Sequence, residues 1–413
     1  MLKTCSYLSP ILIILFWLFG LYEGGWKRQL ETLYSVGLSI IISNVLAMAL
    51  TYFLRGFAFP RAVFIIATFL QVVLLGVWRL IYQAVRDRAE TMKNVVVLGA
   101  NGDGLRMAEK LSSLVGRRYN VCAVYDTGGN DVPLQAVEKA DIVCINSAIP
   151  REEKERLIAA CLERNKEVFV LPELYEILLH NANVERIDDL TVFRVEGLGL
   201  TRGQQLMKRL LDLGLATVAL VLALPLFPVL MLAVRLSSPG PIFYLQKRSG
   251  QGGKPFRLWK FRTMVQDAER LTGPVLASEN DPRITKVGRF LRATRLDELP
   301  QIFNVLKGDM SFVGPRPERP FFVEQFCETM PDYKFRLKVK PGITGLAQVQ
   351  GKYDTGVEDK LRYDLYYIRN YSPLLDLQII FQTLRVVLTP EAARGTRRQA
   401  QALGNGSKGT LNV

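Results

Sequence analysis

The chain has 413 residues, enough for two or three domains, and 49% of them are hydrophobic. Its 53 Lys and Arg residues against 39 Asp and Glu give a net charge of +14, which beside apolar segments favours anionic lipid headgroups or phosphorylated substrates over nucleic acid. A single histidine, His180, excludes His-based metal clusters and Ser–His–Asp triads, and the five cysteines lack the C-x-x-C spacing of zinc sites. Any catalysis must therefore use carboxylates, Lys and Arg, with or without a hard metal ion.

Three apolar segments lie near the N-terminus, at about residues 8–22, 34–54 and 60–82. The second and third reach the roughly 20 residues that a membrane-spanning helix needs, and the first is marginal. No small-x-small cleavage site follows the first segment, so it resembles an anchor more than a cleaved signal peptide. We predict about three transmembrane helices within residues 1–88.

Candidate strands alternate with helical patterns in the next part of the chain, at residues 94–100, 119–125, 141–146 and 167–171. This alternation predicts a Rossmann-like, parallel α/β domain over residues 89–198. The first turn reads GANGDG, and the second strand ends at Asp126. Asn101 occupies the second glycine position of a dinucleotide site, where its side chain would crowd a pyrophosphate. A cofactor site and a scaffold, regulatory or oligomerisation role both stay open, and Asn101 favours the latter.

Residues 219–234 form a fourth apolar run that contains Pro225 and Pro228. Proline lacks an N–H and clashes with the preceding helical turn, and each freed carbonyl in lipid costs several kcal/mol unless it finds a partner. A kinked span and a segment that enters and leaves on one face both fit this pattern. Basic residues on both flanks, among them Lys208 and Arg209, favour the second interpretation, with both ends cytoplasmic.

The segment from Lys247 to Arg295 holds twelve basic and four acidic residues. Within it, apolar and basic residues alternate imperfectly over 256–262, which predicts a short strand with a phosphate-binding edge that includes Lys260 and Arg262. Two stiff Pro/Gly turns follow, one presenting Arg316 and the other Lys340. Such turns suit a site that holds an anionic ligand without ordering a loop.

The motif RLDELPQIF places two adjacent carboxylates, Asp297 and Glu298, before Pro300. Proline is favoured at the first helical position, so we predict a helix from about Leu299–Pro300 with both carboxylates at its N-terminal end. A carboxylate there stays ionised, as a nucleophile or metal ligand must be. An ordinary acidic N-cap explains the pair equally well.

The ordered motifs of residues 203–388 resemble the bacterial polyprenyl-phosphate glycosyl-1-phosphate transferases, the monotopic phosphoglycosyl transferases: SSPGPIFYLQKRSGQGGKPFRLWKFRTM, RLDELPQIFNVLKGDMSFVGPRP, KPGITGLAQV and YDLYYIRNYS. The resemblance implies a membrane protein of α+β class. Its parts would be the transmembrane helices (usually four in the large members, three here), the Rossmann-like domain, and a catalytic domain over 199–389 with a re-entrant helix at about 206–236 and amphipathic interfacial helices. The polar, Gly-rich residues 390–413 predict a disordered tail.

The resemblance implies transfer of a sugar-1-phosphate from a UDP-sugar to undecaprenyl phosphate with release of UMP, the initiating step of exopolysaccharide, capsule or O-antigen synthesis. It places the protein in the bacterial inner membrane among its lipids, with the catalytic and Rossmann-like domains on the cytoplasmic side and a homodimer as a candidate assembly. Mg²⁺ would offset the charge of the two anions that meet. The motifs do not specify the sugar.

The family's functional positions map onto this chain residue by residue. Asp297 would attack the sugar-bearing phosphate and form a phosphosugar-enzyme intermediate, while Glu298 would support it in metal binding or proton handling. Three further family positions are Lys260, Glu324 and Asp364, and Lys340 replaces an arginine, which removes the bidentate fork. The family's helix-breaking Ser-Pro is Leu224-Pro225 here, so we expect Pro228 to sharpen the bend.

Two alternatives are distinguished by the residues. A membrane-anchored nucleotide-sugar dehydratase needs an intact glycine fingerprint and a Tyr-x-x-x-Lys pair, and none of the fifteen tyrosines has a lysine four residues on. A non-catalytic membrane scaffold or regulator of polysaccharide assembly would leave Asp297 and Glu298 free to vary. The complete, ordered set of charged motifs disfavours that second alternative.

Overall fold

The computed structural model describes residues 2–22, 29–53, 61–89, 91–99, 102–112, 119–125, 134–147, 149–179, 182–195, 197–266, 281–351 and 355–388. Asn101, Asp126, His180 and the predicted tail at 390–413 lie outside the described residues. The chain divides into two compact units, one of Met1–Trp17 with Leu21–Glu176 and the other of Leu18–Gly20 with Ile177–Val413.

Three helices open the chain: α1 (Leu2–Leu18), α2 (Gln29–Phe53) and α3 (Arg61–Ala89). Two stretches, Leu30–Leu50 and Ala62–Arg86, are long and apolar enough to cross a membrane, whereas the apolar part of α1, Ser9–Leu18, is shorter. The side-chain amide of Asn44 on α2 donates to Thr68 Oγ1 and to Gln71 Oε1 on α3, each at 2.9 Å. Such hydrogen bonds between helices suit an apolar medium. Of the three predicted spans, two are confirmed by length and composition.

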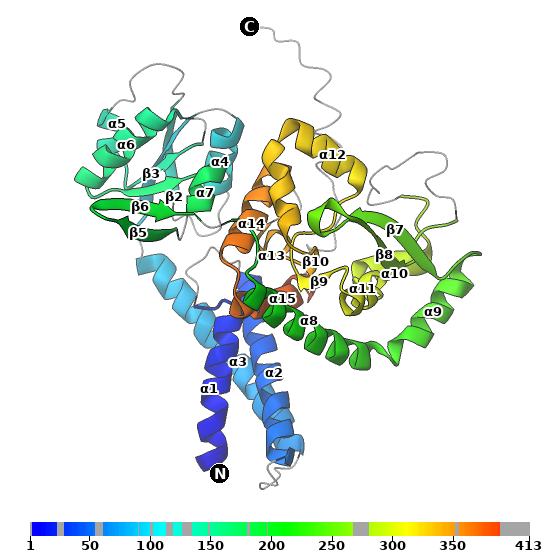
Figure 1. Cartoon of the computed structure of the whole chain (residues 1–413). Coiled ribbons are helices and arrows are strands. Elements are labelled where there is room, and N and C mark those ends of the chain that lie inside the picture. The colour runs from blue at the N-terminus through cyan, green and yellow to red at the C-terminus, as the bar shows by residue number, and fades with distance from the viewer. Residues whose placement is uncertain are drawn as a thin grey trace. The chain divides into compact units, whose positions relative to one another are not determined.

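A four-stranded parallel sheet follows, with strand order β2-β1-β3-β4 (Figure 1). Its strands are the four that the sequence predicts: β1 (Lys93–Leu98), β2 (Tyr119–Tyr125), β3 (Ile142–Ile145) and β4 (Glu167–Val170). Helices alternate with them: α4 (Gly102–Ser112), α5 (Leu134–Lys139), α6 (Arg151–Glu163) and α7 (Leu174–Leu179). One face of β1 packs on α4 and the other on α5 and α6, which is why every residue from Val95 to Leu98 is buried. The predicted Rossmann-like arrangement is present.

A short antiparallel hairpin, which the sequence patterns did not single out, comes next: β5 (Asn183–Ile187) and β6 (Leu190–Arg194). The first residue of its two-residue turn, Asp188, has a positive φ of 57°. Val184 faces Phe193 and Ile187 faces Leu190. These two pairs fall on opposite faces of the hairpin, so the one-sided alternation that usually marks a strand is absent.

The proline-containing segment forms two helices, α8 (Arg202–Ala223) and α9 (Leu226–Ser237), bent by 64° at their junction (Figure 1). A capping box between Thr201 and Gln204 starts α8. Pro225 is the N-cap of α9 and Pro228 lies in its first turn, where a missing N–H leaves no helical bond unmade.

Both arms of this pair bury side chains in one hydrophobic core. Ala216 and Ala223 of α8 and Phe227, Leu230 and Val234 of α9 meet there with Leu258, Phe261, Leu291, Ile302, Val305 and Met310. The opposite faces of both helices carry exposed apolar side chains: Leu206, Leu210, Val218, Val221, Leu222, Leu224, Leu226, Val229, Leu232 and Leu236. Both helices therefore carry apolar side chains on the face that packs in the core and on the exposed face as well.

Lys208 and Arg209, two of the basic residues expected to flank the membrane segment, make contacts inside the protein instead. Lys208 is 5% exposed and forms an ion pair of 2.7 Å with Asp376. Arg209 donates to two backbone carbonyls. These two charges are used in folding, so they carry less weight in an argument about membrane orientation.

The rest of the second unit holds the predicted strand and the carboxylate motif. An antiparallel hairpin of β7 (Phe243–Ser249) and β8 (Pro255–Phe261) confirms the predicted strand, and a parallel pair joins β9 (Ser311–Val313) to β10 (Gly342–Thr344). The remaining helices are α10 (Lys286–Ala293), the 3-10 helix η2 (Leu296–Glu298), α11 (Gln301–Lys307), α12 (Pro320–Thr329), the 3-10 helix η3 (Pro331–Lys338), α13 (Leu346–Gln350), α14 (Val357–Arg369) and α15 (Pro373–Leu388). The predicted helix at Leu299–Pro300 begins at Gln301 with Pro300 as its N-cap, so the carboxylates lie in the preceding η2 turn.

Glycines allow a very close approach of the β9 and β10 segments. A Cβ atom on Gly342 would lie 2.1 Å from the backbone N of Gly314 and 2.3 Å from the carbonyl O of Thr344. Gly314 N donates to Thr344 O at 2.9 Å across this contact. No side chain larger than hydrogen fits at Gly342 without moving backbone.

We predict that Gly342→Ala destabilises the protein by at least the roughly 1–3 kcal/mol typical of an overpacked core. The measurement is the melting temperature of the detergent-solubilised protein. Gly203→Ala, at an α8 position with nothing within 4 Å of the added carbon, is the matched control and should be neutral or stabilising by up to about 1 kcal/mol. Equal melting temperatures for the two variants would contradict the packing described here.

Candidate functional site

The two predicted catalytic carboxylates lie in η2, directly after a residue with unusual backbone geometry. Arg295, the N-cap of η2, has φ 57° and ψ 16°, a left-handed conformation that costs a non-glycine residue of the order of 1–2 kcal/mol. Asp297 and Glu298 follow within the same turn. Strained residues of this kind are concentrated at functional sites, where the surrounding structure holds them.

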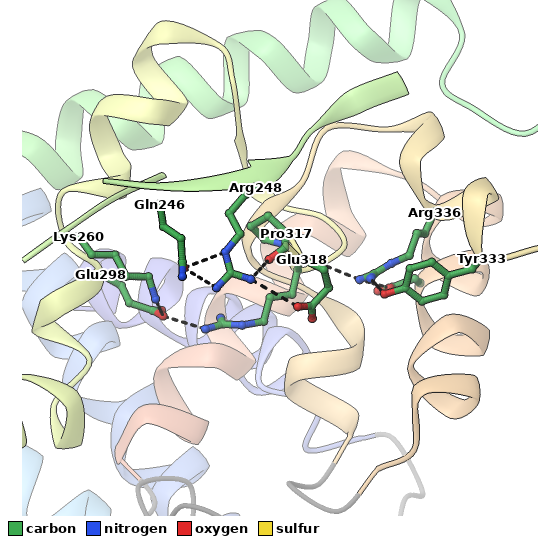
Figure 2. A network of polar contacts seen from close by, with 10 residues as sticks. Gln246, Arg248, Lys260, Glu298, Pro317, Glu318, Tyr333 and Arg336 are labelled. Carbon is green, nitrogen blue, oxygen red and sulfur yellow. Dashed lines mark hydrogen bonds and ion pairs between the residues drawn. The ribbon is translucent and has the colours of Figure 1, made fainter. Parts of the chain in front are cut away.

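Glu298 is held by two cations from separate segments. Its Oε1 accepts from Lys260 Nζ at 2.9 Å, as Figure 2 shows, and also from Arg316 Nη2 at 2.9 Å. Burial alone would raise the pKa of Glu298, but Lys260 and Arg316 outweigh it and hold that pKa well below its usual 4.5. Glu298 is therefore an anion at any physiological pH.

Asp297 is in a different electrostatic position. Its side chain is only 9% exposed, and no described residue makes a hydrogen bond or ion pair with its carboxylate. Burial raises the pKa of Asp297, Lys260 lowers it and the neighbouring Glu298 raises it, with an upward net shift. Two adjacent carboxyl groups whose pKa values are pushed apart are suited to different chemical roles.

Asn304 connects the segment after the carboxylates to the strand that carries Lys260. It lies on α11 and is 1% exposed. Its side-chain amide donates to Arg257 O at 2.8 Å, and its Oδ1 accepts from Trp259 N at 3.0 Å, both on β8. These two bonds fix α11 against β8 and so place Lys260 opposite Glu298.

A small recess with three cationic side chains adjoins the carboxylates, lined by Arg248, Leu258, Lys260, Gln301, Arg316 and Pro317. Arg248 donates to Pro317 O at 3.0 Å and to Gln246 Oε1, and it lies 3.4 Å from Glu318 Oε2 (Figure 2). A second recess shares Arg316 and Pro317 and is lined by Glu318 and Arg336 as well. Arg248, Glu318 and Arg336 were not singled out from the sequence, where they stand among many similar charges.

Asp364, predicted as a substrate or phosphate ligand, reaches the site only through other residues. It is 2% exposed on α14, and its Oδ2 lies 2.8 Å from Arg336 Nη2. Arg336 in turn donates to the backbone carbonyl of Arg316 at 3.0 Å and to the hydroxyl of Tyr333. Asp364 thus supports the backbone of Arg316 through Arg336, and its direct contact with substrate stays a prediction.

Arg262, another predicted phosphate ligand, directly follows β8 and binds carbonyls at the end of a helix. Its guanidinium donates to Ser238 O at 2.6 Å and to Pro239 O at 2.9 Å, at the C-terminal end of α9. The last carbonyls of a helix lack partners within the helix, so a buried arginine is a strong solution there. Its 7% exposure leaves little of it for a ligand.

Lys340 and Glu324 are also placed away from the carboxylate pair. Burial lowers the pKa of Lys340, and Arg209 lowers it further while Asp212 and Asp309 raise it, so its neighbours are on α8 and the α11–β9 connection. Glu324 is exposed on α12. Of the predicted ligands, Lys260 and Arg316 are the two that contact Glu298.

The donor set around η2 suits a hard metal ion bound together with a ligand. Among the described residues, no group of three or more His, Cys, Asp or Glu side chains converges on one point. Mg²⁺ is commonly held by one or two carboxylates plus substrate phosphates rather than by an all-protein cage. Asp297 and the second oxygen of Glu298 meet that requirement.

Comparison with known proteins places the chain in a family. Residues 203–390 match the family model described as bacterial sugar transferase, and residues 18–157 match one described as CoA-binding domain. The chain is 30% identical over 390 residues to the undecaprenyl-phosphate galactose phosphotransferase of Salmonella typhimurium, covering 86% of this chain and 80% of that relative. The chain belongs to the bacterial sugar transferase family.

Two further relatives match over a shorter part of the chain. The UDP-N-acetylgalactosamine-undecaprenyl-phosphate N-acetylgalactosaminephosphotransferase of Aeromonas hydrophila is 42% identical over 249 residues, 59% of this chain and 57% of the relative. The UDP-glucose:undecaprenyl-phosphate glucose-1-phosphate transferase of Escherichia coli is 40% identical over 236 residues, 56% of this chain and 50% of the relative. The chain thus spans about half the length of these two relatives.

The ion pairs of Glu298 predict a pH-dependent contribution to stability. Because the folded-state pKa of Glu298 lies below its usual 4.5, the contribution is complete above that value and is lost as the pH falls toward the folded-state pKa. In metal-free buffer, the difference in melting temperature between wild type and Glu298→Gln should be largest above about pH 5 and shrink toward pH 3. Glu358→Gln, at an exposed helical ion pair with Arg362, is the control and should change little. A difference that grew on acidification would contradict the assignment.

Proposed function

We propose that this protein transfers a sugar-1-phosphate from a UDP-sugar to undecaprenyl phosphate and releases UMP. One observation carries the proposal: a buried carboxylate, Asp297, with which no described residue pairs, stands beside a carboxylate that two cations hold ionised, next to a cationic recess. The names of the family members quoted above describe transfer of galactose, glucose or N-acetylgalactosamine phosphate to undecaprenyl phosphate, which supports the proposal.

The chemistry would proceed in two displacements on one phosphorus atom. An oxygen of Asp297 attacks the sugar-bearing phosphate of the UDP-sugar, the bond from that phosphorus to the bridging oxygen breaks, and UMP leaves with the bonding electron pair. A phosphate oxygen of undecaprenyl phosphate then attacks the same phosphorus and restores the Asp297 carboxylate. The raised pKa of Asp297 makes its carboxylate a stronger nucleophile than an exposed aspartate, while Lys260 keeps it ionisable.

Lys260 and Arg316 would stabilise the charge of the transferred phosphoryl group. Each uses one N–H on Glu298, and an ammonium has three such donors and a guanidinium five, so both retain donors for a phosphate. Glu298 holds them in place before substrate arrives, which avoids reorganisation during the reaction. Mg²⁺, bound by Asp297 or Glu298 together with the diphosphate, would neutralise charge between the meeting anions.

The bent pair α8–α9 is proposed to enter the membrane and leave it on the same face. Three observations support this: the 64° bend, the burial of side chains from both arms in one core, and the apolar exterior of both helices. The carboxylates and both ends of the pair would then face the cytoplasm, where UDP-sugars are found. A homodimer and the predicted interfacial helices remain predictions from the family resemblance.

We expect Asp297→Asn to reduce turnover by more than about 10³-fold, since it replaces the nucleophile by an amide. The assay is UMP release by detergent-solubilised protein with undecaprenyl phosphate and Mg²⁺, over a panel of UDP-glucose, UDP-galactose and UDP-N-acetylgalactosamine. Asp332→Asn, an exposed aspartate on η3, serves as the control and should retain full activity. Full turnover by Asp297→Asn would contradict the covalent mechanism. A wild-type chain that is inactive on every UDP-sugar of the panel would contradict the proposed activity.

The membrane proposal is tested by single cysteines at Gly203 and Leu236, near the outer ends of α8 and α9. Both should be shielded from a thiol reagent restricted to the periplasm and become labelled after lysis, relative to the parent chain with its native cysteines. Shielding of only one of the two would mean that the pair spans the bilayer.

A further inference from the structure

One turn of α8 carries three charged residues that make contacts inside the protein. Lys208, Arg209 and Asp212 have the spacing i, i+1 and i+4, and Asp212 is 3% exposed. A buried carboxylate is costly unless hydrogen bonds or cations compensate it. The contacts of Arg209 and Asp212 therefore show what compensates the cost of placing these charges inside the protein.

Arg209 holds the end of the helix that follows the carboxylate pair. Its Nη1 and Nη2 donate to Val305 O at 2.7 Å and to Leu306 O at 2.8 Å. These are carbonyls of the last turn of α11, which begins three residues after Glu298, with Pro300 as its N-cap. The planar guanidinium matches two adjacent carbonyls, which a lysine would not.

Asp212 binds strand β9, which leads to Arg316, the cation that contacts Glu298. Its Oδ1 accepts from Ser311 Oγ at 2.9 Å and from the backbone N of Phe312 at 2.9 Å, both on β9. β9 ends at Val313, and Gly314-Pro315 then lead directly to Arg316. This connection is short and stiff, with Gly314 N bonded to Thr344 O at 2.9 Å.

The two segments that meet in the Glu298–Arg316 ion pair are thus both attached to the same turn of α8. We propose that Asp212, together with Arg209, is a positioning residue: it sets Arg316 against Glu298 through β9, as Arg209 sets Glu298 through α11. This inference rests on the proposed transferase function. The membrane-associated helix then determines the geometry of the chemistry that lies outside it.

The test compares turnover and KM for the UDP-sugar in Asp212 variants. Asp212→Ala frees β9, and a displacement of Arg316 by about 1 Å should lower kcat on the order of 10²-fold with KM within about threefold. Asp212→Asn keeps an acceptor oxygen for both donors, so it should retain kcat within about threefold of wild type. Ser311→Ala, which removes one of the two bonds, keeps the test valid if Asp212→Ala does not fold, and it should lower kcat by a smaller factor.

A structural role alone would lower stability without this kinetic pattern. Thr383→Val is the matched control, because it removes a hydroxyl contact of 2.7 Å to Thr344 on the neighbouring strand β10. It should lower the melting temperature about as much as Ser311→Ala while leaving kcat unchanged. Equal kcat values for Ser311→Ala and Thr383→Val would overturn the inference.

The route through Arg316 is tested by a double-mutant cycle. If Asp212 acts through Arg316, then Asp212→Ala should cost much less in an Arg316→Lys background than in the wild type. The inference would be overturned if the losses in kcat multiplied in the double variant. It would also be overturned if Asp212→Ala and Asp212→Asn lost kcat equally, or if Asp212→Ala left kcat unchanged. An active wild type with an unaffected Asp212→Ala removes only this inference, whereas an inactive wild type removes the proposed function as well.

Discussion

A buried carboxylate that needs two cations governs the architecture of the second unit. Glu298 stays ionised in a poorly solvated position only because Lys260 and Arg316 both reach one of its oxygens. Those cations come from β8 and from the turn after β9, so the fold must bring two distant segments to one atom. Asn304 ties β8 to α11, and Arg336 supports the Arg316 backbone. Much of the polar network described here therefore serves to place Lys260 and Arg316 at Glu298.

The sequence could predict elements whose signal is local. Runs of apolar residues identified the four parallel strands and two membrane-length helices, and the ordered motifs identified the carboxylate pair. Arg262 shows where this reasoning ends: it stands two residues from Lys260 in a basic run, yet it binds the carbonyls at the end of α9. Only the tertiary structure shows which basic side chain of such a run lies in the candidate site and which one binds backbone carbonyls. The same applies to Asp364, whose partner Arg336 lies 28 residues away in the chain.

The proline pair illustrates a pattern that the sequence left open. A kinked span and a re-entrant segment both fit Pro225 and Pro228, because backbone chemistry alone fixes a break and not the direction of the second arm. The packing adds one constraint, since Ala223 before the break and Phe227 after it bury against the same core, and this supports the proposed re-entrant arrangement. Pro228 lies in the first turn of α9, where a proline is compatible with helix, so its effect is on the start of that helix rather than on its interior.

The shortness of α11 has a consequence for how the protein matures. A helix of seven residues is far below the length at which a helix is stable alone in water. Its order depends on Arg209 at one end and Asn304 in the middle, so the η2 turn before it takes shape only after α8 and β8 have docked. A nascent chain whose α8 has not yet docked would hold Asp297 in an unstructured segment, without aligned cations. For the proposed transferase, the catalytic arrangement of Asp297 and its cations would therefore form only once the domain has assembled.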